Sequence, residues 1–395
     1  MRVVYLLRRF PVLTQTFVSR EIMELVHLGY NISICSYLPP RDLVRTDYVE
    51  PLLSRTIYGP RLHSWRFWRA NLHWLLHAPR SYLRGLARIV SVFWGHWAEL
   101  GRALYFALTA CWFATKLENK PQQTTITHFL GPDTAGCVML KELLAFPFMV
   151  RVHTAIEVKK HYSALLKDAS WVVADYDALA DHLKLNSPSC SPRIRVMPQI
   201  MNLSSCIYLK PEARPTVTLL SVGSLVESKG HSYLLSACRI LRARNLTFRC
   251  LIIGEGPLRR KLEVQIRDEQ LHECVELVGA VAHEKLFQYY ALADIFVLAN
   301  VTSASTADGL PTVVLEAAAS GRPIVASQAA GVPAGVQHEL SGVLVTPRDP
   351  EALAGALERL IKDERLRYTM GMAGRDFILD HYVPEIVIRQ LIECL

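Results

Sequence analysis

Hydrophobic residues in this chain form short continuous runs that alternate with longer amphipathic segments. A short apolar run bounded by turn residues is typical of a buried strand, and apolar residues three or four positions apart are typical of a helix. In the first half the runs predict strands at 3–7, 31–37, 125–129, 148–153, 170–174 and 193–197. Helical structure is predicted at 16–28, where it ends at Gly29, and through most of 60–118.

The second half repeats this alternation after a polar, proline-containing segment at 204–215, which is typical of a linker between domains. Strands are predicted at 217–222, 248–253, 274–277, 295–298, 323–326 and 342–345. Helices are predicted at about 230–244, 257–270, 283–292, 312–320 and 350–362. An amphipathic helix is predicted at 373–395.

Alternating strands and helices indicate an α/β fold of parallel sheets covered by helices on both faces. At 395 residues the chain is long enough for two domains. We therefore predict a Rossmann-like domain at 1–205 and a second at 216–372, facing each other across a cleft. The helix at 373–395 is expected to cross back and pack on the first domain.

Charge and aromatic residues are unevenly distributed. The net charge is +8, and residues 61–120 hold nine Arg or Lys against two acids, Glu99 and Glu118. Six of the seven tryptophans lie at 65–112, interleaved with arginines that include Arg66, Arg69, Arg84 and Arg88. Such a segment can lie on an anionic membrane surface. One alternative is a helical subdomain with buried Trp and solvated Arg. Another is a surface that binds single-stranded nucleic acid, which we rank last.

The pattern of cysteines and the lengths of the apolar runs indicate the cellular compartment. Nine cysteines at wide spacing, with no Cys-x-x-Cys, argue against a zinc site or a disulfide framework and favour a reducing compartment. The first apolar run is too short for a secretory signal, and the uncharged stretch at 103–115 is too short to span a bilayer. We expect a cytoplasmic protein, peripheral at the inner face of the membrane.

Candidate chemistry centres on two carboxylates, Asp308 and Glu316, on either side of a predicted loop-to-helix junction. A helix N-terminus presents free backbone N–H groups to a phosphate, and carboxylates accept hydrogen bonds from sugar hydroxyls. Glu316 lies within an apolar helical run, where a carboxylate is costly to bury without hydrogen-bond partners. Asp308 alone could be a turn residue, and Glu316 alone could be a solvated helix acid. Together they favour a nucleotide-sugar site.

Two glycine turns follow strands of the second half. The first contains Gly223, Ser224 and Lys229, whose amine could neutralise a diphosphate, and the second contains Gly254 and Gly256. Ordinary strand-to-helix turns are the alternative for both.

Two histidines end strands of the first half, His153 and His128. Ligands in open parallel sheets bind outside the carboxyl ends of the strands, so both could face the cleft. A satisfied histidine at a domain edge is the alternative. Asp175 and Asp177 have the spacing of an Asp-x-Asp metal clamp, but no other ligand-type residues cluster with them. Asp177 is explained by helix capping, and no metal is expected.

These motifs together resemble the family-4 glycosyltransferases of GT-B fold, most closely the bacterial colanic-acid and exopolysaccharide transferases. The resemblance covers nearly the whole chain and is strongest at 217–362. It rests on the Asp308–Glu316 motif with its Gly-Leu-Pro core, on the run from Gly331 to Leu353, and on the opening loop at 10–21.

The resemblance implies roles for individual residues. Glu316 would hold the nucleotide ribose and Asp308, where the family usually has Glu, would contact the donor sugar. His153 would lie near the reacting sugar. Thr16 and His128 would lie on the acceptor side. The implied donor-binding set is Gly223, Ser224, Lys229, Gly254, Gly256, Gly309, Leu310, Pro311 and Glu316.

The chain departs from the family pattern at several positions. Ser224 replaces an arginine expected at the diphosphate, Asn202 replaces an aspartate, and Ala334 replaces a glutamate. The implied reaction is retaining, metal-independent transfer of a sugar from a nucleotide diphosphate-sugar to a glycan or lipid-linked acceptor, with no further cofactor. Nucleotide-sugar epimerisation and non-catalytic nucleotide-sugar binding are the alternatives, the second favoured by Ser224 and Ala334.

Overall fold

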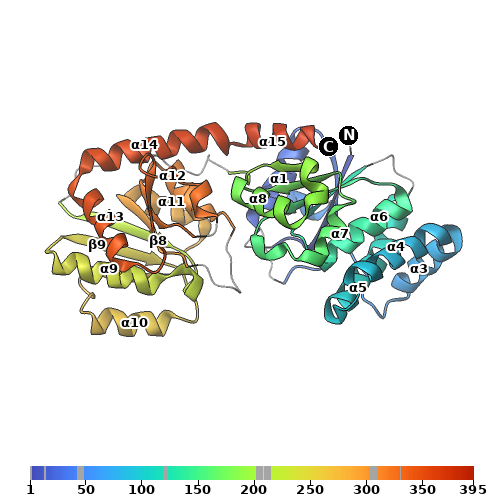
Figure 1. Ribbon diagram of the computed structural model, residues 1–395, viewed down its shortest axis with the longest axis horizontal. Coiled ribbons are helices and arrows are strands. Elements are labelled where there is room, and N and C mark those ends of the chain that lie inside the picture. The colour runs from blue at the N-terminus through green and yellow to red at the C-terminus, as the bar shows by residue number, and fades with distance from the viewer. Residues whose placement is uncertain are drawn as a thin grey trace. The chain divides into compact units, whose positions relative to one another are not determined.

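The computed structural model divides the chain into two compact units, each with its own sheet (Figure 1). Unit 1 comprises residues 1–200 and 387–395, and unit 2 comprises residues 201–386. The structure describes residues 2–12, 15–41, 49–118, 123–201, 208, 215–301, 309–329 and 331–395.

Unit 1 is built on a seven-stranded sheet of order β3-β2-β1-β4-β5-β6-β7, in which every pairing is parallel. Its strands are β1 (Arg2–Arg9), β2 (Asn31–Leu38), β3 (Thr56–Tyr58), β4 (Thr124–His128), β5 (Phe148–Val152), β6 (Trp171–Ala174) and β7 (Ile194–Val196). β1, β4 and β5 are central and almost wholly buried, as their continuous apolar runs require.

The helices of unit 1 are α1 (Thr16–His27), α2 (Glu50–Leu53), α3 (Trp65–His77), α4 (Pro79–Phe93), α5 (Trp97–Leu117), α6 (Ala135–Leu144), α7 (Ser163–Leu166) and α8 (Asp177–Asn186). Three of them, α3, α4 and α5, form a helical insertion between β3 and β4 that packs on α6 (Figure 1). α3 begins after Ser64, whose hydroxyl accepts a hydrogen bond from the Arg66 amide.

One face of this sheet is covered by α1 and by the end of the chain. α1 contributes Val18, Ile22 and Leu25 to a core that also contains Val387 and Leu391. The last residues of the chain therefore pack on the first sheet, and the Thr124 hydroxyl donates to the Leu395 carbonyl at 3.1 Å.

Unit 2 holds a six-stranded parallel sheet of order β10-β9-β8-β11-β12-β13. Its strands are β8 (Val217–Val222), β9 (Phe248–Ile253), β10 (Val275–Gly279), β11 (Ile295–Leu298), β12 (Ile324–Ser327) and β13 (Gly342–Val345). Its helices are α9 (His231–Ala243), α10 (Arg259–Asp268), α11 (His283–Leu292), α12 (Thr312–Ala319), α13 (Pro350–Lys362) and α14 (Glu364–His381), with α15 (Pro384–Glu393) leading into unit 1.

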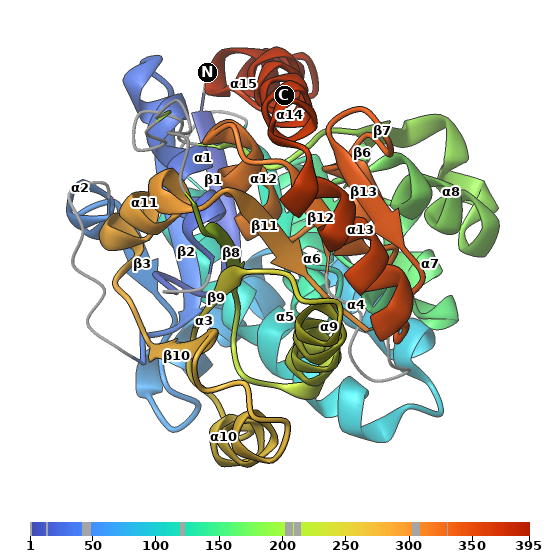
Figure 2. The same ribbon diagram turned by 90° about the vertical axis from the view of Figure 1, so that its left-hand side faces the viewer.

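Helices cover both faces of the second sheet (Figure 2). α9, α10 and α13 lie on one face, where Leu234, Leu241 and Leu357 join the main core of the unit. α11, α12 and α14 lie on the other face. Parallel strands with helices on both faces confirm the α/β class predicted from the sequence.

Two local expectations are wrong. The predicted single helix at 373–395 is two helices: α14 begins at Glu364, and α15 begins anew at Pro384. Proline disfavours a helical conformation in the residue before it, which explains the break. Asp177 is the first residue of α8, whose capping position is Tyr176, so no aspartate caps that helix.

Candidate functional site

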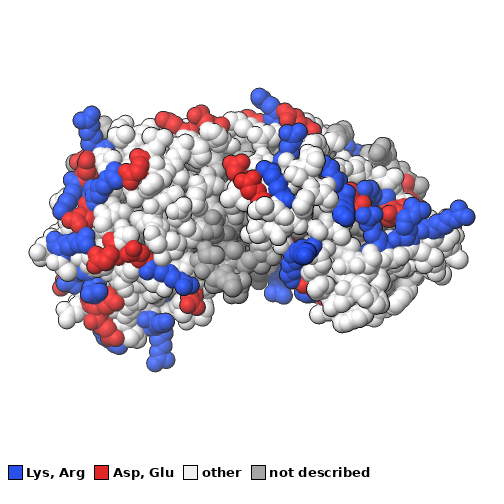
Figure 3. Space-filling model, viewed as in Figure 1, with Lys and Arg blue, Asp and Glu red and all other residues white. Residues whose placement is uncertain are grey.

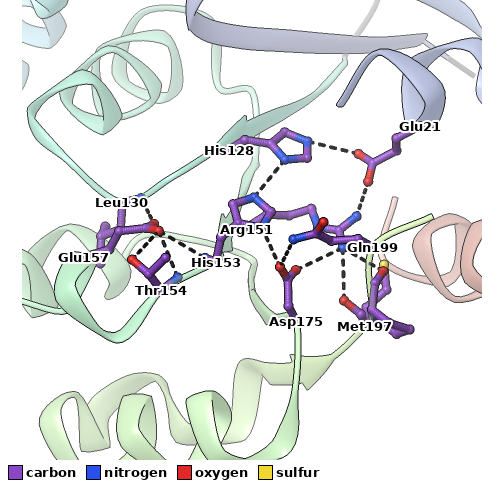
Figure 4. Close-up of polar contacts among 11 residues, drawn as sticks. Glu21, His128, Leu130, Arg151, His153, Thr154, Glu157, Asp175, Met197 and Gln199 are labelled. Carbon is purple, nitrogen blue, oxygen red and sulfur yellow. Dashed lines mark hydrogen bonds and ion pairs between the residues drawn. The ribbon is translucent and has the colours of Figure 1, made fainter. Parts of the chain in front are cut away.

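The carboxyl ends of β4, β5 and β6 carry a fully buried cluster of charged and polar side chains (Figure 4). His128 ends β4, Arg151 lies near the end of β5, and His153 follows that strand directly. Asp175 follows β6, and Glu21 reaches the cluster from α1. Three neighbouring parallel strands therefore bring together residues far apart in the sequence.

The two histidines form a continuous chain between the two carboxylates. His128 Nε2 lies 3.2 Å from Glu21 Oε1, and His128 Nδ1 lies 3.1 Å from His153 Nε2. His153 Nδ1 lies 2.7 Å from Asp175 Oδ2. Each of these three hydrogen bonds needs one proton. Two neutral imidazoles supply only one N–H each, and an ionised carboxylate supplies none. The chain of contacts is therefore complete only when it holds one extra proton.

Burial lowers the pKa of His128, and the nearby Glu21 carboxylate opposes this shift. Burial by itself would raise the pKa of Asp175, but attraction to His153 and Arg151 and hydrogen bonds from His153 and Gln199 outweigh it and lower the pKa. The rings of Phe17 and Phe129 pack on His153 at centroid distances of 5.0 and 4.7 Å.

Arg151 is the second cation of the cluster. Its guanidinium forms an ion pair with Glu21, lies 3.5 Å from Asp175 Oδ1 and donates to the Met197 and Pro198 carbonyls, both at 3.0 Å. With one extra proton shared by the two histidines, the charges of Glu21 and Asp175 are balanced by Arg151 and the histidine pair. Such balance lets buried charges persist in a protein interior. Burial tends to raise the pKa of Glu21, but Arg151, His128 and Tyr5 lower it to about 2.

A cavity of about 650 Å³ adjoins this cluster in unit 1. His128 lines it together with Glu157, whose carboxylate accepts hydrogen bonds from the amides of Leu130 at 2.8 Å and Thr154 at 2.9 Å. Glu157 thus joins the loops that follow β4 and β5 (Figure 4). Basic side chains in the cavity lining are Arg8, Arg9, Arg41 and Lys159. This cavity can hold an anionic group beside the strand ends.

Glu316 is the corresponding buried carboxylate of unit 2. It lies on α12, is only 3 % exposed, and accepts hydrogen bonds from Tyr290 Oη at 2.9 Å and His283 Nε2 at 3.0 Å. The solvated-acid alternative for Glu316 is therefore wrong. Each carboxylate oxygen can accept two hydrogen bonds, so Glu316 keeps capacity for further donors.

The segment before α12 carries three more of the predicted residues. Gly309 is half-buried, Leu310 is buried, and Pro311 occupies the capping position without a side-chain cap. The backbone at Gly331 packs tightly there, because a Cβ at Gly331 would lie 2.5 Å from the Leu310 amide nitrogen. Asp308 lies outside the described residues.

The two glycine turns of unit 2 pack on each other. A Cβ at Gly254 would lie 2.0 Å from the Gly223 carbonyl oxygen, and one at Gly256 would lie 2.6 Å from the Leu225 carbonyl oxygen. Glycine is thus required at both positions by contact between the turns, and close approach of a ligand is not needed to explain it. A Cβ at Gly223 would meet only the Lys229 side chain, 3.5 Å away. The Lys229 side chain therefore lies over the turn that contains Gly223 and Ser224.

His231, the first residue of α9, follows the same turn and was not singled out by sequence reasoning. Its ring is buried, and neither nitrogen has a hydrogen-bond partner within the described part of the chain. Burial lowers the pKa of His231 to about 4, so its ring is neutral at pH 7.

The structure brings His128 and His153 together, whereas the half-buried Thr16 lies at the start of α1, next to Phe17. Sequence reasoning missed Glu21, Arg151, Asp175 and Gln199. Asp175 was considered only as part of an Asp-x-Asp metal clamp and was set aside for lack of further ligand-type residues in the sequence. The signal available for Asp175 and Arg151 was their place at the carboxyl ends of strands, the criterion that selected the histidines.

Comparison with known proteins adds to this geometry. Residues 216–363 match the family described as glycosyl transferases group 1. The chain is 28 % identical to the amylovoran biosynthesis glycosyltransferase AmsK of Erwinia amylovora, covering 100 % of this chain and 99 % of the relative. It is 26 % identical to the putative colanic acid biosynthesis glycosyltransferase WcaL of Salmonella typhimurium, covering 100 % and 99 %.

Residues 216–363 thus form a glycosyl transferases group 1 domain, and the relatives that align with the whole chain are named glycosyltransferases. The chain is therefore a glycosyltransferase by its relatives, which decides against the epimerase alternative.

Solved structures agree on the fold. Sucrose-phosphate synthase from Thermosynechococcus elongatus superposes with a TM-score of 0.73 at 19 % identity, covering 100 % of this chain and 98 % of that one. Anabaena HepE in complex with UDP superposes with a TM-score of 0.71 at 13 % identity, covering 100 % and 99 %. The fold of this glycosyltransferase is therefore GT-B. Among its described helices, none is both long and apolar enough to cross a bilayer.

Proposed function

We propose that this glycosyltransferase transfers a sugar from a nucleotide diphosphate-sugar to a glycan or lipid-linked acceptor in exopolysaccharide biosynthesis. Support comes from the amylovoran and colanic acid relatives, which align with the whole chain. The observation that carries the proposal is Glu316, a buried carboxylate with spare acceptor capacity behind the uncapped start of α12.

In this proposal the donor binds to unit 2. Glu316 accepts hydrogen bonds from the ribose hydroxyls, and Asp308 accepts from the donor sugar. The amides of Gly309 and Leu310 donate to the diphosphate at the start of α12, and Lys229 places its ammonium beside the Gly223–Ser224 turn. These groups stabilise the leaving diphosphate electrostatically, so the proposed reaction uses no metal. Retention of the configuration of the sugar is proposed from the family resemblance.

The acceptor is proposed to bind to the cavity in unit 1 beside His128. Arg8, Arg9 and Arg41 in its lining suit the phosphate of a lipid-linked acceptor, whereas Lys159 is paired with Glu99. Both ring nitrogens of His153 are already occupied by Asp175 and His128. His153 therefore has no free ring nitrogen with which to donate a hydrogen bond to the sugar, and its proposed role is to hold His128 beside the cavity.

The helical insertion is proposed to hold the enzyme at the inner face of the cytoplasmic membrane. Of the arginines considered for this role, Arg84 and Arg88 are engaged in ion pairs with Glu142 at 3.4 Å and Asp168 at 2.6 Å. Arg66 and Arg69, on α3, are exposed. The membrane contact thus depends on α3 more than on α4.

The decisive experiment incubates the purified chain with radiolabelled UDP- and GDP-sugars, with and without a membrane lipid extract as acceptor. Transfer of label to lipid-linked glycan supports the proposal. Interconversion of the donor without acceptor, or donor binding without turnover in the presence of extract, contradicts it. A thermal-shift panel of nucleotide diphosphates identifies the base, since a ligand that binds the folded state raises Tm.

A further inference from the structure

Helix α3 presents three different faces. Its buried face, with Phe67, Ala70, Asn71 and Trp74, packs on the rest of the helical insertion. Opposite the core lies an exposed apolar face, here called the α3 apolar face, made of Trp65, Trp68, Leu72, Leu75 and Leu76. A third, basic face carries Arg66, Arg69 and His73. Apolar side chains so exposed on one contiguous face indicate an interaction surface.

A cavity of about 550 Å³ lies between the basic face of α3 and the end of α5. Its lining includes Arg66, Arg69 and His73 from α3 and Trp112, Thr115 and Lys116 from α5. Two tryptophans hold cations at its edges: the Arg69 guanidinium lies 5.2 Å from the Trp65 ring centroid, and the Lys116 ammonium lies 4.6 Å from that of Trp112.

The charges of this cavity are not balanced within the described chain. Its acid, Glu118, contacts His73 at 3.2 Å. Arg66, Arg69 and Lys116 form no ion pair with any carboxylate of the described residues, unlike Arg84 and Arg88 of α4. A neighbouring cavity shares Arg66 and Trp112 and adds Arg61 and His63. Lys and Arg gather over the region of α3, α4 and α6 (Figure 3).

We propose that the cavity between α3 and α5 binds the phosphate of an anionic phospholipid headgroup while the α3 apolar face enters the adjacent acyl region. This inference rests on the membrane contact of the proposed function and names its binding site. Two guanidinium groups and an ammonium group around one hollow match the charge and hydrogen-bonding geometry of a phosphate.

The α3 apolar face favours a lipid over a soluble anion as the ligand of this cavity. Trp65 is 62 % exposed, Trp68 is 58 % exposed and Leu76 is 67 % exposed, on the helix that lines the cavity. A soluble phosphate ligand would leave these side chains in water. A lipid headgroup in the cavity brings them to the interfacial region, where tryptophan and leucine side chains are favoured.

The test is co-sedimentation with three kinds of vesicle: phosphatidylcholine alone, phosphatidylcholine with phosphatidylglycerol, and phosphatidylcholine with oleate at matched surface charge. We expect the parent protein to prefer the phosphatidylglycerol vesicles. The double variant Arg66→Gln/Arg69→Gln is expected to bind them about 30-fold more weakly and to lose the preference over oleate. Leu72→Ser/Leu76→Ser is expected to weaken binding to all three kinds.

The matched control is Arg80→Gln/Arg102→Gln, which removes the same charge from exposed arginines of the insertion outside the cavity lining. It should keep the preference for phosphatidylglycerol. Equal effects of the two double variants, or equal binding to phosphatidylglycerol and oleate, would overturn the proposal. Sugar transfer to a detergent-solubilised acceptor is measured in parallel: its retention in the cavity variant separates loss of lipid binding from failure of the proposed enzymatic function.

Discussion

Glu21 and Glu316 are both buried carboxylates near the strand ends of a parallel sheet, but they are held differently. Glu21 contacts the cations of a charge-balanced cluster, Arg151 above all, and also accepts a hydrogen bond from Tyr5. Glu316 accepts hydrogen bonds from Tyr290 and His283 and has no Lys or Arg in its ion-pair contacts within the described chain. A carboxylate saturated by fixed cations serves the fold, whereas one with no Lys or Arg partner and with spare acceptor capacity can serve a ligand.

The largest effect on stability is expected from Glu21→Ala. The variant leaves Arg151 buried without its main partner and removes the acceptor at one end of the histidine chain. Breaking a buried ion pair by removing one partner costs about 3–5 kcal/mol, and we expect the free energy of unfolding of unit 1 to fall by this amount in urea denaturation. Glu24→Ala, on the same helix, is the control and should change it little. Equal losses in the two variants would show that Glu21 is not anchored as described.

For Glu316 the large effect is expected on activity. Glu316→Ala should lower kcat/KM for sugar transfer by about 100-fold or more, since the ribose contact and the position of α12 depend on it. The fold should persist, because no buried cation is left without a partner, and Tm checks this. Glu276→Ala removes an exposed acid of the same unit, which pairs with Arg249, and should be neutral. Parent-level turnover in Glu316→Ala would remove Glu316 from the site.

Acid should weaken the contacts that hold Glu21. The pKa of Glu21 in the folded protein is lowered to about 2 from an ordinary value of 4.5. A lowered pKa contributes stability that is present above the ordinary value and is lost as the pH falls through the folded one, here about 3 kcal/mol between pH 4.5 and 2. The lowered pKa of Asp175 acts in the same direction. We expect urea denaturation of Glu21→Gln, measured across this range, to show a shallower pH dependence than the parent. Identical slopes would contradict the assignment.

The smallest effect is expected from Tyr290→Phe, which removes one of the two described hydrogen-bond donors to Glu316. A single hydrogen bond of this kind contributes about 1 kcal/mol, so we expect a modest fall in Tm. If the ribose hydroxyls of the nucleotide-sugar also bind Glu316, they can replace the hydroxyl of Tyr290. Saturating nucleotide should then restore part of the lost Tm in a thermal-shift measurement. A loss as large as that of Glu316→Ala would mean that Tyr290 itself belongs to the donor site.

The histidine chain shows why part of the site could be predicted and part could not. His128 and His153 were found because each follows an apolar run, and strand ends are readable from one segment at a time. Their pairing at 3.1 Å, and the extra proton that it requires, depend on the adjacency of β4 and β5, which no local pattern contains. Glu21 was missed for the same reason: on α1 it has the spacing of an ordinary helix residue, and only the packing of α1 on β1 and β4 buries it.

The amino-acid sequence alone determined the α/β class, most strands and helices, and the glycosyltransferase resemblance, because these follow from hydrophobic periodicity and from short motifs. Tertiary structure alone decided which charges are neutralised by others. Arg66 and Arg88 look alike along the chain, yet Arg88 contacts Asp168 whereas Arg66 lines an unbalanced cavity. Electrostatic energy depends on distance and burial in space, and sequence separation specifies neither.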